Sequence, residues 1–135
     1  VYQLTVLASI IEGETNYKPE MSRISGVYHN RLKIGMKLQA DPTVQFVSPP
    51  GTTRITFKEL KINSPFNTYM YAGLPPEPIN NPGQDALQAA FFPESHSYMY
   101  FVADKNTGRH IFTKSFAEHL KAAKEYQKWY RSLKK

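Results

Sequence analysis

The sequence predicts an α+β fold, in which a mostly helical single domain carries a small antiparallel β-hairpin and a long proline-rich functional loop. Three observations support this class. Apolar residues recur at helical spacing in several segments, one segment near the C-terminus alternates as strands do, and five of the ten prolines lie within residues 65–82. With 135 residues, 41% of them hydrophobic, the chain can bury a core, so residues 1–135 are expected to form one domain.

The first part of the chain predicts three helices in succession. Apolar residues recur at helical spacing over about residues 1–14. Pro19 suits a first helical position, and the helix that it opens is expected to end near Gly35, because glycine favours a helix C-terminus. Asp41, which is followed by a proline, is typical of an N-cap and predicts a third, short helix.

The middle of the chain combines short helices with an irregular loop. Thr56 and Glu59 have the spacing of a capping box, which predicts a short helix to about Lys61. The prolines of residues 65–82 remove so many N–H donors that no regular helix or central strand is expected there, and a long ordered loop of this kind is usually functional. Asn81, again followed by a proline, is expected to cap another helix. The predicted inner face of that helix consists of Ala86, Leu87 and Ala90.

The C-terminal part predicts the hairpin and a last helix. Residues 97–103 alternate and are rich in tyrosine, phenylalanine and valine, which favours a strand. Residues 104–108 are typical of a turn, and residues 109–113 then form the returning strand. Ser115 and Glu118 repeat the capping-box spacing and open a helix that is expected to reach the C-terminus.

The net charge of +6 is concentrated in that last helix. Seven basic and two acidic residues follow residue 113, so this part holds +5 of the total and the rest of the chain is nearly neutral. Lys121, Lys124, Lys128, Arg131 and Lys135 form one helical stripe, opposite Leu120, Ala123, Tyr126 and Tyr130. We interpret the stripe as a solvated face, with attraction to wall polymers or anionic lipid as the second hypothesis. Nucleic acid is not an expected partner, because neither a basic recognition helix nor an aromatic sheet platform is present.

Several kinds of chemistry are excluded or disfavoured by composition. There is no cysteine, which excludes disulfides, thiolate metal sites and a cysteine nucleophile. The four histidines are scattered without a ligand spacing, so we expect neither a metal site nor a cofactor. No apolar run approaches the ~20 residues of a membrane span. The sequence begins at Val1 without an initiator methionine, and we therefore expect a domain taken from a longer protein.

The remaining candidate chemistry is that of carboxylates, and Glu14 is the strongest candidate. On a helix, Glu14 falls near the middle of the apolar arc of residues 4–11, whereas Glu12 falls outside it. A partly buried carboxyl group has a raised pKa, which would let it donate a proton near neutral pH. The alternative is that Glu14 caps the end of the helix or pairs with an arginine such as Arg23 or Arg31.

Three further residues are candidate substrate ligands. The side chain of Gln39 could bind a polar group such as a sugar amide, while the neighbouring Asp41 is better explained as an N-cap. Asn67 and Tyr69 lie on the proline-rich loop, where amide and phenol groups beside a rigid backbone suit carbohydrate recognition. The alternative is a tyrosine that packs and an asparagine that satisfies the backbone of a turn.

These residues occur in a series of segments that resembles a known family. The segments are L-A-S-I-I-E-G-E-T (7–15), N-R-L (30–32), G-M-K-L-Q-A-D-P-T-V (35–44), S-P-F-N-T-Y (64–69), G-L-P-P-E-P-I (73–79), N-P-G (81–83) and Y-F-V-A (100–103), together with Phe112 and His119. In this order they resemble the YceG-like family of endolytic murein transglycosylases over essentially the whole chain. Gly13 stands where the family often has lysine, and Phe66 where it usually has tyrosine.

The resemblance implies a reaction and a role for each candidate. The family cleaves the bond between N-acetylmuramic acid and N-acetylglucosamine within peptidoglycan strands and forms a 1,6-anhydro end. By resemblance, the second glutamate of the E-x-E-T pattern, Glu14, acts as the acid and then as the base. Gln39, Asn67 and Tyr69 are the expected ligands of the glycan, and no cofactor is implied. Glu12 could orient the neighbours of Glu14 or be a solvated surface charge, and we favour the second interpretation.

The resemblance also implies a place and leaves alternatives open. Family members are typically anchored in the cytoplasmic membrane by an N-terminal helix, with the catalytic domain on the periplasmic or wall side. The expected partners are peptidoglycan glycan strands, and the cell-wall synthesis machinery would fit as well. The alternatives are a non-catalytic glycan-binding module, a plain hydrolase and, least favoured, a nucleic-acid-binding protein.

Overall fold

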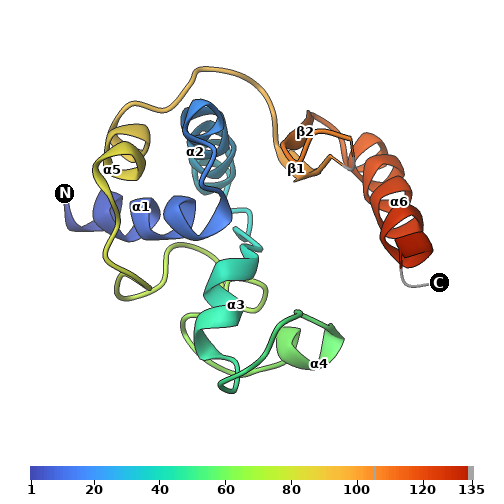
Figure 1. The fold of residues 1–135 in the computed structure, drawn as a ribbon. Coiled ribbons are helices and arrows are strands. Elements are labelled where there is room, and N and C mark those ends of the chain that lie inside the picture. Colours follow the sequence, from blue (N-terminus) through green and yellow to red (C-terminus); the bar gives the residue numbers. More distant parts are fainter. Residues whose placement is uncertain (105, 134–135) are drawn as a thin grey trace.

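The computed structural model describes residues 1–104 and 106–133, which form helices and one pair of strands. In chain order the elements are α1 (Tyr2–Glu14), α2 (Lys18–Lys33), α3 (Asp41–Val47), α4 (Phe57–Leu60), α5 (Gln84–Phe91), β1 (Tyr100–Ala103), β2 (His110–Thr113) and α6 (Phe116–Leu133). Figure 1 shows α1, α2 and α5 packed together, α3 and α4 below them, and the strands with α6 to one side. The predicted α+β class is confirmed.

Helix α1 is the central helix of the core. Its consecutive residues 6–11 are all buried, which a single face of a helix cannot provide. They are enclosed because α5, α2 and α3 all contact α1. The core that results joins apolar residues of α1 and α2 to the small residues Ala86, Ala89 and Ala90 of α5. The C-terminal end of α1 leaves this core and delivers Glu14 to its edge.

Both ends of α2 follow the local signals in its sequence. Pro19 lies in the first turn. At the other end Gly35 adopts a φ of +70°, and its N–H donates to the carbonyl of Leu32. The N–H of Met36 donates to the carbonyl of Arg31, which completes a Schellman motif. The predicted end of this helix near Gly35 is therefore confirmed.

An extended segment, residues 92–99, connects α5 to the hairpin and lies along α2. The Glu94 N–H donates to the Ser22 carbonyl at 2.9 Å, and the Asn30 side chain donates to two carbonyls of the segment. At Gly26 the segment comes so close that a Cβ atom would clash with the Glu94 carbonyl oxygen. A glycine is therefore needed at this point of α2, and the contact anchors the hairpin to the core.

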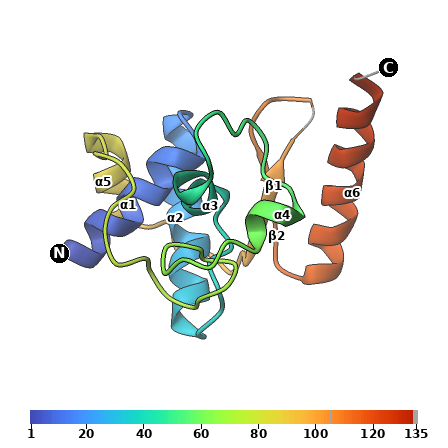
Figure 2. The same cartoon turned by 90° about the horizontal axis from the view of Figure 1, so that it is seen from below.

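The two strands pair antiparallel, with Tyr100 opposite Thr113. The first strand begins later than the predicted residue 97. The reason is that the Arg31 side chain of α2 binds the carbonyl of Met99 at 2.7 Å and holds the preceding segment against the helix. Helix α6 packs on both strands and has no fully buried residue. Figure 2 shows α6 beside the hairpin, at a distance from α1 and α5.

The two faces of α6 differ from the prediction in one residue. Leu120 is 42% exposed, so it does not share the inner face with Ala123, Tyr126 and Tyr130, which are partly buried. The basic residues Lys121, Lys124, Lys128 and Arg131 are exposed as expected, and Lys135 lies outside the described residues. Across residues 1–104 and 106–133, no helix combines the length and apolarity that crossing a membrane requires.

Two predicted N-caps are wrong. Ala40 is the N-cap of α3 and Gly83 is the N-cap of α5, instead of Asp41 and Asn81. In both cases a residue at the helix start is engaged in a tertiary contact. The Asp41 carboxylate accepts a hydrogen bond from the Tyr69 hydroxyl, and the N–H of Gly83 is bound by a carboxylate from α1.

The capping box of the short helix α4 is present as predicted, with Thr56 as its N-cap. Replacing Thr56 by alanine is expected to lower the free energy of unfolding by about 1 kcal/mol, because the first turn of α4 loses its side-chain acceptor. Urea denaturation would measure the change. Lys58→Ala, on the same helix and also exposed, is the matched control. A loss of equal size in both variants would contradict a specific capping role.

Candidate active site

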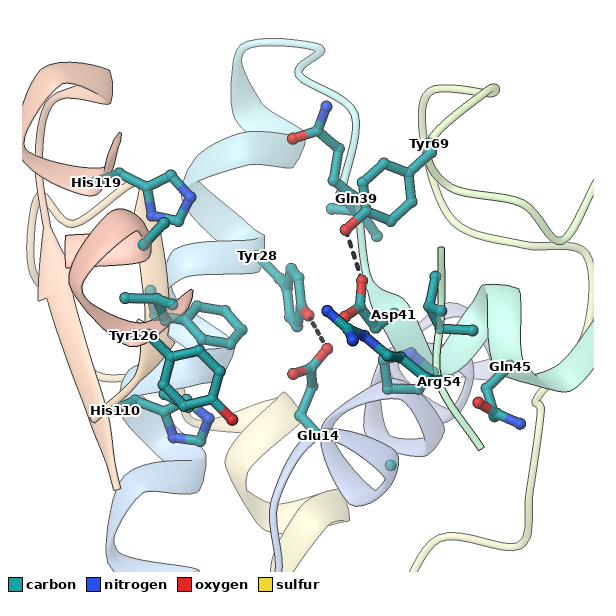
Figure 3. A pocket seen from close by; sticks show the side chains of 18 of the residues that line it. Glu14, Tyr28, Gln39, Asp41, Gln45, Arg54, Tyr69, His110, His119 and Tyr126 are labelled. Carbon is teal, nitrogen blue, oxygen red and sulfur yellow. Dashed lines mark hydrogen bonds between the residues drawn. The ribbon is translucent and has the colours of Figure 1, made fainter. Parts of the chain in front are cut away.

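An open cleft lies between the helical core and the unit formed by the hairpin and α6. Its volume is about 1280 Å³. The C-terminal end of α1 and the start of α3 line its base, residues 53–55 and Tyr69 line one side, and the strands and α6 line the other. Figure 3 shows Glu14 within this cleft, with polar and aromatic side chains from both sides around it.

Glu14 accepts a hydrogen bond from the Tyr28 hydroxyl at 2.8 Å. Part of the residue faces the cleft, but protein surrounds its carboxyl group, and burial raises its pKa from 4.5 to about 7. The hydrogen bond from Tyr28 opposes this rise, the negative charge of Asp41 adds to it, and the positive charge of Arg31 opposes it. A large fraction of Glu14 is therefore protonated at neutral pH and able to donate a proton.

The alternative explanations of Glu14 do not agree with its contacts. Arg23 is paired with Glu94 at 2.9 Å. The Arg31 guanidinium donates to backbone carbonyls, among them that of Leu38 at 2.7 Å. No ion pair to Glu14 is present among the described residues, and its hydrogen bond with Tyr28 is to another helix instead of a cap.

Tyr28 holds the Glu14 carboxyl group from within the core. Only 1% of its surface is exposed, and its ring meets the edge of the Phe101 ring. Burial and the neighbouring Glu14 raise the pKa of the Tyr28 hydroxyl well above its usual value, so the hydroxyl stays a donor. Since Tyr28 comes from α2, the position of Glu14 depends on the packing of α2 against α1.

Asp41 and Tyr69 form a second hydrogen-bonded pair in the cleft. The Tyr69 hydroxyl donates to the Asp41 carboxylate at 2.6 Å, and both residues line the cleft. Burial and the charge of Asp41 raise the pKa of Tyr69, which keeps its proton. Asp41 is thus a residue of the candidate site that its local sequence explains only as a helix cap. The fold brings it to Tyr69 across 28 positions of the chain.

Gln39 lines the cleft in a strained backbone conformation. Its φ of +50° lies in the left-handed region, which glutamine rarely adopts. The Gln39 N–H donates to the carbonyl of Thr68 at 3.2 Å, which ties this turn to the proline-rich loop. The side chain is exposed to the cleft. Strain of this kind is found where the surrounding structure fixes a binding group.

Asn67 is not brought into the cleft. It is fully buried, and its side-chain amide donates to the carbonyls of Leu60 and Ile62. Its side-chain oxygen accepts the N–H of Tyr69 at 2.9 Å. Every group of this side chain is therefore used to shape the loop that carries Tyr69.

Glu12 is not the solvated surface charge expected from the sequence. Its carboxylate accepts the N–H of Gly83 at 2.7 Å. Next to it, Ser9 accepts the N–H of Ile79, and the Asn80 side chain donates to the Ser9 carbonyl at 2.8 Å. These bonds fasten the end of the proline-rich loop to α1, beside the turn that carries Glu14.

The far side of the cleft is formed by residues that no local motif reveals. His110 of β2 has its Nδ1 atom 3.0 Å from Glu20, and His119 of α6 stacks on Tyr100 with 5.0 Å between ring centroids. Burial lowers the pKa of His119. Tyr126 and the other aromatic residue of that face, Tyr130, also line the cleft. In the sequence, this face is indicated by His119 in the family resemblance and by its helical spacing with Tyr126 and Tyr130.

The fold and the cleft define an α+β protein in which a glutamate with a raised pKa lines an open groove. Within residues 1–104 and 106–133, no three histidine, aspartate or glutamate side chains converge as ligands of a metal ion. The chain belongs to the YceG-like family, whose family model matches residues 1–125.

Relatives of the chain bear one consistent name. The chain is 43% identical over 126 residues to an endolytic murein transglycosylase of Bacillus subtilis (strain 168). That alignment covers 93% of this chain and 35% of the Bacillus protein. A protein of the same name from Streptococcus pneumoniae serotype 2 (strain D39) is 29% identical over 88% of this chain and 22% of its own length. The chain thus spans about a third or less of these relatives.

A solved structure has the same fold. The crystal structure of a yceG-like protein from Listeria monocytogenes matches with a TM-score of 0.84 and 40% sequence identity. The match covers 90% of this chain and 39% of that one. The arrangement of helices and strands therefore recurs in a relative.

Proposed function

We propose that this protein is an endolytic lytic transglycosylase that cleaves the bond between N-acetylmuramic acid and N-acetylglucosamine in peptidoglycan strands. The observation that carries the proposal is the Glu14 carboxyl group, which has a pKa of about 7 and faces an open cleft. A cleft that is open to solvent suits a polymeric substrate such as a strand. The names of the relatives support the same substrate class.

In the proposed reaction, Glu14 serves first as the acid and then as the base. Its carboxyl group donates a proton to the glycosidic oxygen while the bond from C1 of the muramyl sugar to that oxygen breaks, and the electron pair leaves with the oxygen. The Glu14 carboxylate then removes the proton of the muramyl 6-hydroxyl, whose oxygen forms the new bond to C1. The carboxyl group is regenerated, no water is consumed, and the product is a 1,6-anhydro end.

Neighbouring groups support this cycle through charge and position. The oxocarbenium ion that develops at C1 is positive, so the negative charges of Asp41 and of ionised Glu14 favour it. The N-acetyl group of the substrate can add to this stabilisation. Tyr28 fixes the carboxyl group of Glu14 and keeps its pKa from rising further.

The glycan is held, in this proposal, by Gln39 and Tyr69, whose side chains line the cleft. Asn67 acts from behind them, because its amide holds the backbone of the loop on which Tyr69 lies. The proposed glycan ligands are therefore Gln39 and Tyr69, and Asn67 shapes the loop without contacting the glycan.

Analysis of the products on purified peptidoglycan tests the proposed reaction. Mass spectrometry of the digest should find 1,6-anhydro-muramyl ends that arise within strands. New reducing ends would identify a hydrolase instead. Binding of strands without any cleavage would identify a non-catalytic glycan-binding module.

The substrate implies a place of action. We propose that the protein works in the bacterial cell envelope, on the extracytoplasmic side of the cytoplasmic membrane, where it would meet strands made by the cell-wall synthesis machinery. Fractionation of cells, followed by detection of the protein in the envelope fraction, tests this placement. Recovery of the protein in the cytosol would contradict it.

Replacing Tyr28 by phenylalanine is expected to change the pH dependence of cleavage. The hydroxyl of Tyr28 lowers the pKa of Glu14, so its removal raises that pKa from about 7 to a higher value and shifts the alkaline limb of kcat/KM to higher pH. Loss of this positioning bond, worth about 1 kcal/mol, should also lower kcat roughly fivefold. A pH–rate profile measures both effects. Tyr71→Phe, which removes an exposed hydroxyl bound to Asn63, is the matched control, and an alkaline limb that stays in place would contradict the role of Tyr28.

A further inference from the structure

The loop between α3 and α4 reaches across the cleft to α6 through Arg54. The Arg54 guanidinium lies over the Tyr130 ring, 4.9 Å from its centroid. Both residues line the cleft that contains Glu14, and Figure 3 shows Arg54 directed into it. Stacking on an aromatic ring restricts the orientations that the guanidinium adopts.

The stacking leaves the edge of the guanidinium available. Its N–H donors lie in the plane of the group and match the two oxygens of a carboxylate. Among the described residues, no carboxylate or carbonyl pairs with Arg54, although Asp41 and Glu14 line the same cleft. Arg131, the residue after Tyr130, adds a second positive charge to this part of the lining.

Three other arginines differ from Arg54 in their guanidinium partners or in their position relative to the cleft. Arg23 is paired with Glu94, and the Arg31 guanidinium is bound to backbone carbonyls. Arg109 also stacks on a tyrosine, with 4.4 Å to the centroid of the Tyr17 ring, but it does not line the cleft. Arg54 alone among these four combines a stacked guanidinium, a free edge and a position in the candidate active site.

We propose that Arg54, held on Tyr130, binds a carboxylate carried by the glycan strand and thereby makes the cleft selective for anionic strands. This inference rests on the proposed function, since it takes the strand as the occupant of the cleft. Two groups on a peptidoglycan strand supply such a carboxylate. One is a carboxylate of the stem peptide, and the other is the lactyl carboxylate of a muramyl sugar from which the peptide has been removed.

The experiment measures binding of soluble strands to protein that carries Glu14→Gln, so that no strand is cut. Three strands are compared: one with stem peptides, one freed of peptides by an amidase, and one whose peptide carboxylates are converted to neutral methylamides. Each strand is titrated with three proteins: the Glu14→Gln variant, the double variant Glu14→Gln/Arg54→Gln, and the double variant Glu14→Gln/Arg109→Gln. Arg54 and Arg109 are both exposed, and circular dichroism checks that each variant is folded.

The expected result is that peptide-bearing strands bind about tenfold more tightly than methylamidated ones, and that Arg54→Gln removes this difference while Arg109→Gln keeps it. If instead only the peptide-free strand binds tightly and through Arg54, its lactyl carboxylate is the group that is bound. Weaker binding of the peptide-free strand than of the peptide-bearing one assigns the stem peptide. The proposal is overturned if the preference survives Arg54→Gln, if all three strands bind alike, or if no strand binds. If wild type makes no anhydro ends but the Arg54-dependent preference is found, the proposed reaction fails and this inference stands.

Discussion

Replacing Glu14 by glutamine is expected to lower kcat/KM for strand cleavage by about 10²- to 10⁴-fold, with no loss of the fold. Glutamine keeps the size of the side chain and an oxygen that can accept the Tyr28 hydrogen bond. It cannot donate a proton to the glycosidic oxygen or remove one from the 6-hydroxyl, so both proposed steps lose their catalyst. Release of anhydro-muropeptides from purified peptidoglycan, followed over time, measures the effect.

Glu12→Gln is the matched control for this loss. Glu12 is two residues away on the same helix, but its carboxylate accepts the N–H of Gly83 and does not line the cleft. The glutamine oxygen can still accept that bond, so activity should remain within a few-fold of wild type. Full activity of Glu14→Gln would remove Glu14 from the mechanism, and an equal loss in both variants would point to damage at the end of α1.

The second large effect is a gain of stability by the same Glu14→Gln variant, which develops between pH 4.5 and 7 and persists at higher pH. The pKa of Glu14 is about 7 in the folded protein and 4.5 for an ordinary glutamate. Below pH 4.5 the group is protonated in both states and contributes no difference. Between pH 4.5 and 7 the unfolded chain releases the proton that the folded protein keeps. Wild type is therefore expected to lose about 2–3 kcal/mol of stability relative to the variant over this range, with no further change above it.

Urea denaturation of both proteins at pH 4, 6 and 8 measures this difference. Glu77→Gln, which removes an exposed carboxylate of the proline-rich loop, controls for the loss of a charge as such. A stability difference between wild type and Glu14→Gln that stays constant with pH would contradict the raised pKa. A difference that shrinks as pH rises would contradict its sign.

The elements of this fold were predictable where their signals are local. The Gly35 end of α2 and the capping box at Thr56 need only neighbours in the chain, and both are present as predicted. Asp41 and Asn81 have equally good local signals for an N-cap, and both predictions are wrong. In each case a residue at the helix start is hydrogen-bonded to a partner distant in sequence, Tyr69 for Asp41 and Glu12 for Gly83. No pattern within one helix can reveal such a partner.

In the candidate site, too, some residues could be predicted from the local sequence and others are brought together only by the fold. The position of Glu14 beside the core follows from the helical arc of α1, and its raised pKa agrees with that expectation. Asn67 looked like a ligand because it is polar and lies on a rigid loop, but the carbonyls it binds come from Leu60 and Ile62. The opposite wall, with Arg54 meeting Tyr130, exists only once α6 is placed across from the loop.

Because of that placement of α6, the width of the groove and the stability of the core depend on different parts of the protein. Helix α6 has no fully buried residue, it packs on the strands, and the core around α1 is complete without it. Opening of α6 from the hairpin therefore requires much less free energy than unfolding the core, and amide hydrogens of α6 should exchange with solvent sooner than those of α1. The aperture of the groove can thus change in evolution, through substitutions on one peripheral helix, while the thermodynamic stability of the protein stays almost the same.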